Sequence, residues 1–409
     1  MNNVVIIGGG AAGLMAAGTA LKNGSSVSII EKNEKLGRKL MITGKGRCNL
    51  TNNCTDLQQL IKNVPTNGRF LYSAFSSFMP QDMMNLVESL GVPLKTERGN
   101  RVFPVSDKAA DIVDALKLYS KGAHFVHASL KEFKTRNGRI ISAVLNDGSE
   151  IKGDKFILAT GGMSYPLTGS TGDGYAIVKK LGHTITEIKP SLVALRSNDG
   201  FCSRLQGLSL KNVTLSLFLD GKKKPLYSEL GEMLFTHFGI SGPLVLSASA
   251  YIKDFEKHDY YVLLDLKPGL SEEQLEARIM RDFQNNSNKD FINSLDSLLP
   301  KKLIPVVVNL SGIDARKKVN QITKEERNAF VYLLKNFKIR IFDFWSIEQA
   351  VITSGGVSVK EIDPKTMRSK LIDNLYFAGE IIDVDAFTGG FNLQIAFSTA
   401  NSAAIAASE

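Results

Sequence analysis

The opening of the chain restricts its fold more than any other stretch. Residues 4–7 are apolar and β-branched, which is typical of a buried parallel strand. Three glycines follow in the spacing GxGxxG, and they are Gly8, Gly10 and Gly13. A helical pattern over residues 14–21 and a second apolar strand over residues 27–30 come next, and this strand closes on Glu31. Strand, glycine turn, helix, strand and acid in this order predict a βαβ unit that binds a dinucleotide.

Each part of this unit has a physical role in such binding. Gly8 allows the tight turn, Gly10 lets backbone approach a pyrophosphate, and Gly13 lets the helix pack closely on the strand. The first helical turn presents free N–H groups to the phosphate charge. Glu31 is placed to accept hydrogen bonds from the ribose hydroxyls.

The pattern changes several times further along the chain. Residues 56–120 have mainly helical patterns. The stretches "AHFVHASLKEF", "RIISAVLN" and "EIKGDKFILAT" are then interpreted as successive strands, and hairpin turns at Asn137-Gly138 and Asp147-Gly148 predict a β-meander. The meander leads into "FILATGG", where Gly161 and Gly162 allow backbone to come close to a ligand.

A chain of 409 residues exceeds the usual size of one domain. We expect an α/β protein in which a Rossmann-like domain with a β-meander, formed by residues 1–190 and 352–409, is interrupted twice. The first insertion is an antiparallel β-barrel-like domain of residues 191–269 and 337–351, and the second is a small helical domain of residues 270–336.

Composition limits the environment of the protein. Three cysteines are too few for a disulfide framework, so a reducing compartment and a cytoplasmic location are expected, with no metal site at CxxC spacing. No signal peptide and no apolar run long enough to cross a membrane is recognised. A formal net charge of +9 permits an anionic partner such as RNA or a nucleotide, but a solvated basic surface has the same charge.

The stretch "LMITGKGRCNLTN" of residues 40–52 allows three interpretations: a phosphate loop, a metal or redox site, or the lining of another pocket. A Walker loop requires Ser or Thr after Gly-Lys, and Gly46 stands there instead. Metal ligands at suitable spacing are lacking. We therefore expect a cradle in which Gly44 and Gly46 allow close approach, while Lys45, Arg47 and Asn49 offer hydrogen-bond donors. The alternative for Lys45 and Arg47 is that they only form salt bridges.

The end of the chain predicts a second contact with the same ligand. "YFAGE" reads as a strand that ends at Gly379-Glu380, and Glu380 or Asp383 is the candidate partner for a ribityl chain. Gly389-Gly390 then opens a long helix of small residues, whose N-terminus is suited to stabilise negative charge on a reduced ring system.

Several long motifs resemble one known family. "GRKLMITGKGRCNLTN", "RVFPVSDKA", "SYPLTGSTGDGY", "FTHFGISGP" and "GEIIDVDAFTGGFNLQIA" are similar to the HI0933-like (BaiN/RdsA) family of FAD-dependent oxidoreductases, which are two-dinucleotide-binding-domain flavoproteins. The resemblance spans nearly the whole chain and implies FAD as cofactor. Family activities differ: they include reduction of a steroid-like enone, oxidation of a small amine and reduction of a uridine base in ribosomal RNA.

The βαβ unit, the glycine-rich turns and the family resemblance together give a set of residues expected to bind FAD. They are Gly8, Gly10, Ala11, Ala12, Gly13, Glu31, Lys32, Lys39, Gly44, Lys45, Arg47, Cys48, Asn49, Thr160, Gly161, Gly172, Asp173, Gly379, Glu380, Gly390, Phe391, Asn392 and Leu393.

The catalytic residues are less clearly marked. Hydride transfer belongs to the flavin, whereas the protein supplies a proton for reduction of a C=C bond. Cys48 and His237 are the candidate proton donors, and the alternatives are a packed core thiol and a structural histidine. No metal or Ser-His-Asp motif is recognised.

Three functions remain open. The first is an NAD(P)H-driven reductase of a C=C bond, with a ribosomal RNA uridine as lead substrate, and it is favoured by basic clusters at residues 222–224, 301–302 and 316–318. The second is an oxidase of a small amine that uses O2, and the third is a flavin-dependent sensor without turnover. No second GxGxxG opens a helix, so a nicotinamide nucleotide would have to dock transiently over the flavin.

Overall fold

The computed structural model describes residues 2–409, which form two compact units. Unit 1 contains the residues up to Ser191 together with Ser346–Glu409, and unit 2 contains Leu192–Trp345. An α/β fold with a parallel Rossmann-type sheet and antiparallel sheets is confirmed. The further division of the inserted part into a barrel-like and a helical domain stays a prediction.

A parallel five-stranded sheet forms the centre of unit 1. Its strands, in spatial order, are β20 (Leu375–Phe377), β10 (Lys155–Leu158), β1 (Asn3–Ile7), β2 (Ser26–Glu31) and β6 (His124–His127). Val4 to Ile7 are at most 4% exposed, which explains why these four residues are all apolar: they are covered on both faces of the sheet.

The expected meander is smaller than the sequence suggested. A three-stranded antiparallel sheet contains β7 (Leu130–Arg136), β8 (Arg139–Leu145) and β9 (Glu150–Lys152). The first of the expected strands, β6, instead joins the parallel sheet. The parallel sheet also contains β10, the "FILATGG" strand into which the meander was expected to lead. The meander packs on that sheet through Phe133, whose ring meets Phe156 edge-on at 5.6 Å.

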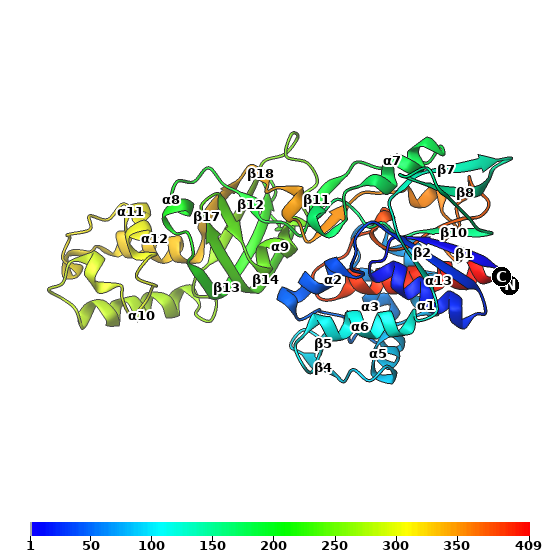
Figure 1. Ribbon diagram of the computed structural model, residues 1–409. Coiled ribbons are helices and arrows are strands. Elements are labelled where there is room, and N and C mark those ends of the chain that lie inside the picture. The colour runs from blue at the N-terminus through cyan, green and yellow to red at the C-terminus, as the bar shows by residue number, and fades with distance from the viewer. Residues whose placement is uncertain (1) are drawn as a thin grey trace. The chain divides into compact units, whose positions relative to one another are not determined.

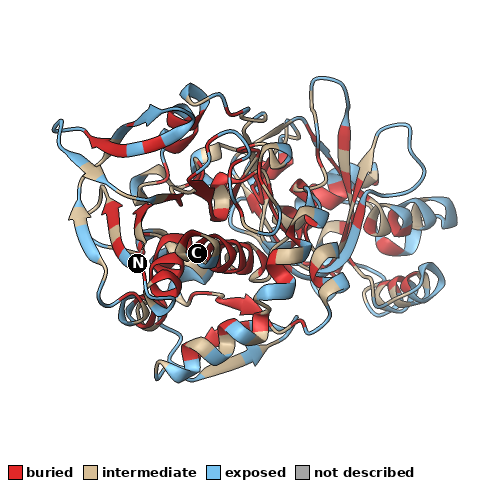
Figure 2. Cartoon of the chain, turned by 90° about the vertical axis from the view of Figure 1, so that its right-hand side faces the viewer, coloured by how far each residue is buried: buried red, intermediate tan, exposed pale blue. Residues whose placement is uncertain are grey.

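Two helices of small residues pack against each other in the core of unit 1 (Figure 1). They are α1 (Ala11–Lys22) and α13 (Phe391–Ser408). The helix that ends at the C label in Figure 2 is largely red, in agreement with the burial of α13. A Cβ on Gly379 would lie 2.9 Å from the Cβ of Ala12 and 3.6 Å from that of Ala396, so this glycine allows both helices to approach the end of β20.

The region 56–120 is mainly helical, as expected, but a small sheet formed by two of its strands and one strand that precedes it was missed. Its strands pair as β3 (Thr51–Asn52), β5 (Arg101–Pro104) and β4 (Leu94–Glu97). The other helices of unit 1 are α2 (Arg38–Ile42), α3 (Leu57–Lys62), α4 (Tyr72–Ser77), α5 (Pro80–Ser89), α6 (Ala109–Tyr119) and α7 (Asp173–Lys180). A two-stranded pair joins β11 (Lys189–Ser191) and β19 (Ile352–Ser354).

A seven-stranded antiparallel sheet organises unit 2. In spatial order it contains β17 (Phe337–Ile341), β16 (Tyr260–Asp265), β13 (Ser209–Leu219), β14 (Tyr227–Thr236), β15 (Gly239–Ser241), β12 (Leu195–Arg196) and β18 (Asp343–Phe344). Only Phe342 separates β17 from β18, although they lie at opposite ends of this order. The sheet must therefore curl strongly, which agrees with the expected barrel-like form.

Helices complete unit 2, and residues 270–336 are helical as expected. These helices are α8 (Phe201–Arg204), α9 (Pro243–Ser249), α10 (Glu272–Gln284), α11 (Ile304–Ser311) and α12 (Lys324–Lys335). The buried sides of these helices and of the sheet share one apolar core. Within residues 2–409, no helix has both the length and the apolar character that a membrane crossing requires.

A buried histidine connects distant segments of unit 1. The His183 ring is 2% exposed, with Nδ1 3.2 Å from Glu361 Oε2 and Nε2 3.0 Å from Ser369 Oγ. Burial lowers the pKa of His183, although Glu361 opposes this shift. The folded protein therefore keeps the imidazole neutral at pH values where the unfolded chain is protonated.

This difference predicts that stability is lost on acidification. The stability contributed by neutral His183 is complete above about pH 6.5, the ordinary histidine pKa, and is lost as the pH falls below it. We expect His183→Gln to cost about 1–3 kcal/mol at pH 7.5 through lost hydrogen bonds and packing. Urea unfolding at pH 7.5 and 5.5 should show a smaller acid loss for the variant than for the parent, and equal losses would contradict the prediction.

Candidate functional site

The glycine turn after β1 leaves the N-terminus of α1 open. A Cβ on Gly8 would lie 2.4 Å from Ala159 O, and one on Gly13 would lie 1.8 Å from Gly8 O, so neither position admits a side chain. Gly10 is the N-cap of α1, and a Cβ there would meet nothing within 4 Å. No side chain caps α1 and its first turn contains no acid. The free N–H groups and the space beside Gly10 are suited to a pyrophosphate.

The carboxylate of Glu31 lies beside this turn. It accepts hydrogen bonds from Gly9 N at 2.7 Å and from the backbone and side chain of Asn33 at 2.8 and 2.7 Å. These bonds fix the acid at the end of β2. Its expected contact with a ribose stays a prediction.

The end of β10 contributes a polar atom without a partner. Thr160 Oγ1 is buried and forms no hydrogen bond with the described residues. A Cβ on Gly174 would lie 2.1 Å from this oxygen, so α7 approaches closely. Lys32 joins the same helix to β2, because its Nζ lies 2.6 Å from both Asp173 Oδ2 and Thr171 Oγ1. The unpaired hydroxyl of Thr160 and the uncapped N-terminus of α1 indicate that unit 1 is shaped for a polar ligand such as FAD.

An ion pair connects α2 with the loop after β20. Lys39 Nζ lies 2.6 Å from Glu380 Oε2 and 2.7 Å from Ser164 Oγ. The other oxygen of Glu380 accepts from Thr353 N at 2.9 Å and from Ser164 Oγ at 3.1 Å. The two charged side chains are only 22% and 12% exposed. The structure therefore brings together Lys39 and Glu380, two predicted site residues that are distant in the sequence.

Ser164 and Thr353 were not among the predicted site residues. Ser164 lies two residues after the predicted Gly161-Gly162 turn, so a wider window around that turn would have included it. Thr353 carries no comparable signal. Thr353 reaches the site because it lies on β19, and the pairing of β19 with β11 depends on long-range folding. Asp383, the alternative to Glu380, accepts from Asn67 Nδ2 at 3.2 Å, and burial raises its pKa.

The N-terminus of α13 is also uncapped by a side chain. Its N-cap, Gly390, has φ of 98°, and a Cβ there would lie 2.3 Å from Thr51 O. The side-chain oxygen of Asn49 accepts from Gly390 N at 2.9 Å. The Asn392 amide is bound to the backbone of Ala386 at 2.8 Å. Asn49 and Asn392 thus position the helix start, while the next N–H groups can face negative charge.

The loop before β3 has an uncommon backbone. Gly44, Lys45 and Gly46 have φ values of 56°, 59° and 83°, and Cys48 has φ of 60°. Left-handed backbone at a non-glycine residue such as Lys45 costs about 1 kcal/mol or more and concentrates at functional sites.

Arg47 holds this loop against the small sheet. Its guanidinium forms salt bridges with Glu97 and, at 2.6 Å, with Asp107, and it lies 4.2 Å from the centroid of the Phe103 ring. The arginine lowers the pKa of Glu97. The structure therefore assigns Arg47 a partner within the protein, whereas Lys45 is exposed and forms no ion pair among the described residues.

Cys48 is inaccessible in this structure. Its side chain has no exposed surface, and burial raises the pKa of the thiol to about 12. A proton donor must reach its substrate, and a buried thiol cannot do so without movement of the loop. These observations favour the packing interpretation.

We therefore expect Cys48→Ala to keep FAD and at least half of the parent turnover. It should lower the free energy of unfolding by about 1–2 kcal/mol, because a small cavity replaces the sulfur. Steady-state turnover and thermal unfolding check this prediction. Loss of turnover with unchanged flavin content and stability would instead identify the thiol as the proton donor.

His237 lies in unit 2, in the tight turn between β14 and β15. Its side chain is exposed, and its ring meets Phe238 at 5.0 Å and Trp345 at 6.0 Å. Phe238 and Trp345 stack with centroids 3.7 Å apart. An accessible imidazole beside an aromatic surface remains a candidate proton donor.

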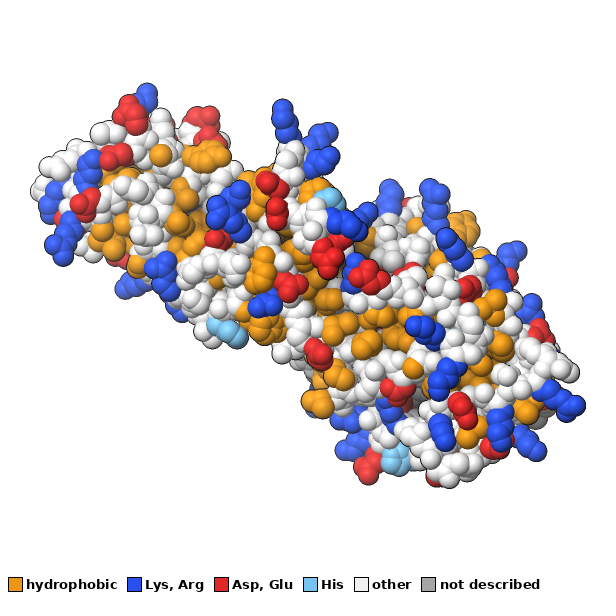
Figure 3. All heavy atoms as spheres, turned by 90° about the horizontal axis from the view of Figure 1, so that it is seen from above, with side chains coloured by type: hydrophobic (Ala, Val, Ile, Leu, Met, Phe, Trp, Pro, Cys, Tyr) orange, Lys and Arg blue, Asp and Glu red, His pale blue; other side chains and the backbone are white. Residues whose placement is uncertain are grey.

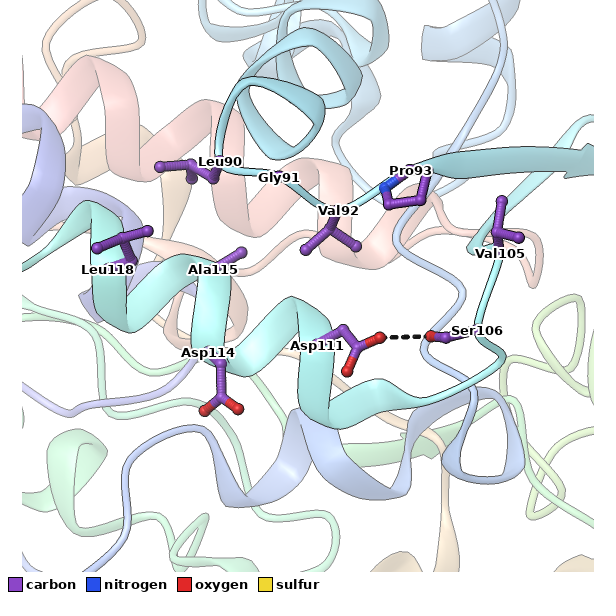
Figure 4. Close-up of a pocket in the computed structure, with 10 residues that line it drawn as sticks. All are labelled: Leu90, Gly91, Val92, Pro93, Val105, Ser106, Asp111, Asp114, Ala115 and Leu118. Carbon is purple, nitrogen blue, oxygen red and sulfur yellow. Dashed lines mark hydrogen bonds between the residues drawn. The ribbon is translucent and has the colours of Figure 1, made fainter.

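A separate surface pocket lies between α5, β4 and α6 (Figure 4). It is lined by Val92, Pro93 and Leu118 among others, with Asp111 turned toward Ser106 and bonded to its hydroxyl at 2.5 Å. None of the residues expected to bind FAD or to act in catalysis lines it.

The fold and the open glycine turn define unit 1 as a flavoprotein-type dinucleotide-binding unit. The sequence matches the family described as HI0933-like protein Rossmann domain over residues 2–406, and the chain belongs to this family. Its class, an FAD-dependent oxidoreductase, is confirmed.

Relatives with assigned activities match over almost their whole length. The chain is 32% identical over 412 residues to the ribosomal RNA dihydrouridine synthase of Haemophilus influenzae, covering 99% of this chain and 98% of the relative. It is 30% identical over 417 residues to the 3-dehydro-bile acid delta(4,6)-reductase of Clostridium scindens, covering all of both chains.

A solved structure supports the fold. The 3-ketosteroid-delta4-(5alpha)-dehydrogenase of Rhodococcus jostii, in complex with 4-androstene-3,17-dione, matches with a TM-score of 0.54 and 14% identity, covering all of this chain and 97% of that one. At this identity the likeness concerns the fold alone.

Proposed function

We propose that this protein is an NAD(P)H-driven reductase of a C=C bond, with a uridine of ribosomal RNA as its lead substrate. The observation that carries the proposal is the full-length similarity to the ribosomal RNA dihydrouridine synthase of Haemophilus influenzae. A relative from Escherichia coli with the same activity is 28% identical over 402 residues. Formation of dihydrouridine is the reduction of one C=C bond of the base.

FAD, when bound, supplies the hydride chemistry. The chain would hold its pyrophosphate at the N-terminus of α1, with Gly10 leaving the space. The N-terminus of α13 would favour negative charge on the reduced ring. Lys39 orients Glu380 through a 2.6 Å contact in a partly buried place, so this acid can position the sugar-like chain of the cofactor.

Proton delivery remains with the two candidates. His237 is exposed, so its imidazole is accessible to a substrate and to protons from solvent. Cys48 is buried and its pKa is about 12, so we place the thiol second. A transient nicotinamide donor and a cytoplasmic location are further parts of the proposal.

The overall charge agrees with an RNA substrate but does not locate it. Figure 3 shows lysine and arginine side chains spread over the whole face in view, with acidic ones between them. Such a distribution raises the encounter rate with a polyanion without defining a docking site.

A half-reaction experiment tests the proposal. The FAD-loaded protein is reduced anaerobically with NADPH or NADH and then mixed with ribosomal RNA lacking dihydrouridine. We expect flavin reoxidation together with dihydrouridine in the RNA. Unchanged dihydrouridine content in the ribosomal RNA of a deletion strain would contradict the uridine assignment.

The similarity to the bile acid reductase favours one alternative, a reductase of a small enone. The same reduced protein discriminates between them. Reoxidation by a 4-en-3-one steroid and not by RNA would support the alternative, and rapid reoxidation by O2 with an amine as reductant would support an oxidase.

A further inference from the structure

One face of the sheet in unit 2 is open to solvent and carries a defined pattern. Along β13, β16 and β17 alternate residues point into the apolar core, among them Leu217, Val262 and Ile339. The residues between them lie on the opposite face. They are Ser216, Phe218, Tyr261, Leu263, Lys338 and Arg340, and each is half-buried or exposed.

Two aromatic rings stack in the middle of this face. Phe218 and Tyr261 are directly paired across β13 and β16, with ring centroids 5.3 Å apart and planes 5° from parallel. Arg340 is the partner of Tyr261 on β17, so three strands carry one continuous row. Lys338 Nζ lies 4.0 Å from the centroid of the Tyr261 ring.

The cations around this row are not neutralised by the protein. Within residues 2–409, neither Lys338 nor the guanidinium of Arg340 forms an ion pair, although the Arg340 backbone N donates to Asp199 at 2.8 Å. Residues 222–224 are three exposed lysines. They lie in the turn that follows β13, the strand whose last two residues are Phe218 and Leu219. Two exposed acids, Asp220 and Asp259, lie at the same end of the sheet as these lysines. With Asp199, three acids lie near the five cations, so a net positive charge remains.

We propose that this face binds single-stranded RNA, with a base stacked on Tyr261 and the neighbouring phosphates held by Lys338, Arg340 and the lysines of residues 222–224. The inference rests on the proposed function, since it supplies a docking surface for the RNA substrate. Stacked aromatic rings on an open sheet with flanking cations are the chemistry that recognises unpaired bases and their backbone. A stacked base displaces the Lys338 ammonium from the ring toward the adjacent phosphate.

This combination favours RNA over other anionic surfaces. A lipid surface requires cations and apolar insertion, but a flat ring pair between two strands cannot insert. An acidic peptide pairs with the cations, but it has no flat group that stacks on the parallel rings. Unpaired nucleotides bind both the rings and the cations, because every base has a π-face and every phosphate linkage carries one negative charge.

The test separates stacking from charge. Binding of a fluorescent, unstructured 12-nucleotide RNA to the FAD-loaded full-length protein is followed by anisotropy at several salt concentrations. Tyr261→Ala should weaken binding roughly 5- to 100-fold while the salt dependence stays the same, because a base contact is lost. The double variant Lys338→Gln/Arg340→Gln should lower the slope of log K against log salt by about 1.4, since two phosphate contacts are lost.

A charge-matched control is available in the same unit. The double variant Lys289→Gln/Lys324→Gln removes two exposed cations of the helical segment 270–336 and should retain binding within about twofold of the parent. All variants must keep the parent flavin absorbance and melting temperature. Phe218→Leu, which keeps an apolar side chain, is the second stacking variant if Tyr261→Ala is unstable.

Equal affinity of the parent and both face variants would overturn the inference, as would binding to phosphatidylserine vesicles that exceeds binding to RNA and depends on the same residues. The proposed function is judged separately by dihydrouridine formation. RNA binding that depends on Tyr261 without any dihydrouridine would retain this surface and reject the uridine chemistry. Dihydrouridine formation unaffected by Tyr261→Ala and by the double variant would retain the uridine chemistry and reject this surface.

Discussion

A Gly10→Ala variant is expected to fold like the parent and to lose most of its FAD. Gly10 has φ of −83°, and a Cβ there would meet nothing within 4 Å, so alanine strains neither the backbone nor the packing. If the pyrophosphate lies at the N-terminus of α1, the added methyl group occupies its space. We expect FAD affinity to fall by roughly ten- to a hundredfold, which corresponds to a clash of about 1.4–2.8 kcal/mol.

Two other glycines make this experiment specific. Gly13→Ala places a methyl group 1.8 Å from Gly8 O, so it should lower the melting temperature and the flavin content together. Gly269 also faces open space, has no positive φ and lies in unit 2. Gly269→Ala should therefore change neither the melting temperature nor the flavin content. Flavin absorbance per protein and the melting temperature of the apoprotein are the two measurements. Full FAD content in Gly10→Ala would show that the pyrophosphate is not bound at this turn.

The elements that sequence predicts correctly are those defined by local rules. Residues 4–7 and 27–30 lie within β1 and β2, and residues 14–21 lie within α1, because periodicity and glycine spacing are properties of neighbouring residues. The assignment of strands to sheets was less successful. The hairpin turns correctly joined β7 to β8 and β8 to β9, but no local signal shows that β6 and β10 pair with β2 and β1.

The candidate site shows the same limit. Lys39 and Glu380 were predicted separately, but their contact spans 341 residues and depends on the whole fold. For Arg47 the sequence left a ligand contact and a salt bridge open, and it could not show that acids 50 and 60 residues away bind this side chain. The left-handed backbone of Lys45 and Cys48 could not be predicted from the sequence either, because non-glycine residues rarely adopt this conformation.

The ion pair between Lys39 and Glu380 leads to the second large effect. Lys39→Met leaves the Glu380 carboxylate, only 12% exposed, without its cation. Removing one partner of a buried pair costs about 3–5 kcal/mol, and the partial exposure reduces this to about 2 kcal/mol. Glu380→Gln should cost less, because its amide oxygen can still accept from Thr353 N and Ser164 Oγ.

A double-mutant cycle isolates the interaction. Lys39→Met/Glu380→Gln should be about as stable as Glu380→Gln alone, since no uncompensated carboxylate remains, giving a coupling energy of about 2 kcal/mol. The control pair is Lys32 and Asp173, which has the same 2.6 Å separation but side-chain exposures of 27% and 45%. Its coupling should stay below about 1 kcal/mol.

Flavin binding gives a second measurement on the Lys39–Glu380 pair. If Glu380 positions the cofactor, both single variants at the Lys39–Glu380 pair should weaken FAD binding, and the double variant should recover stability but not affinity. Urea unfolding of the apoprotein and FAD titration measure these two quantities independently. Recovery of full FAD affinity in the double variant would mean that Glu380 stabilises only the fold, and that the ribityl partner must be sought elsewhere, with Asp383 as the next residue to test.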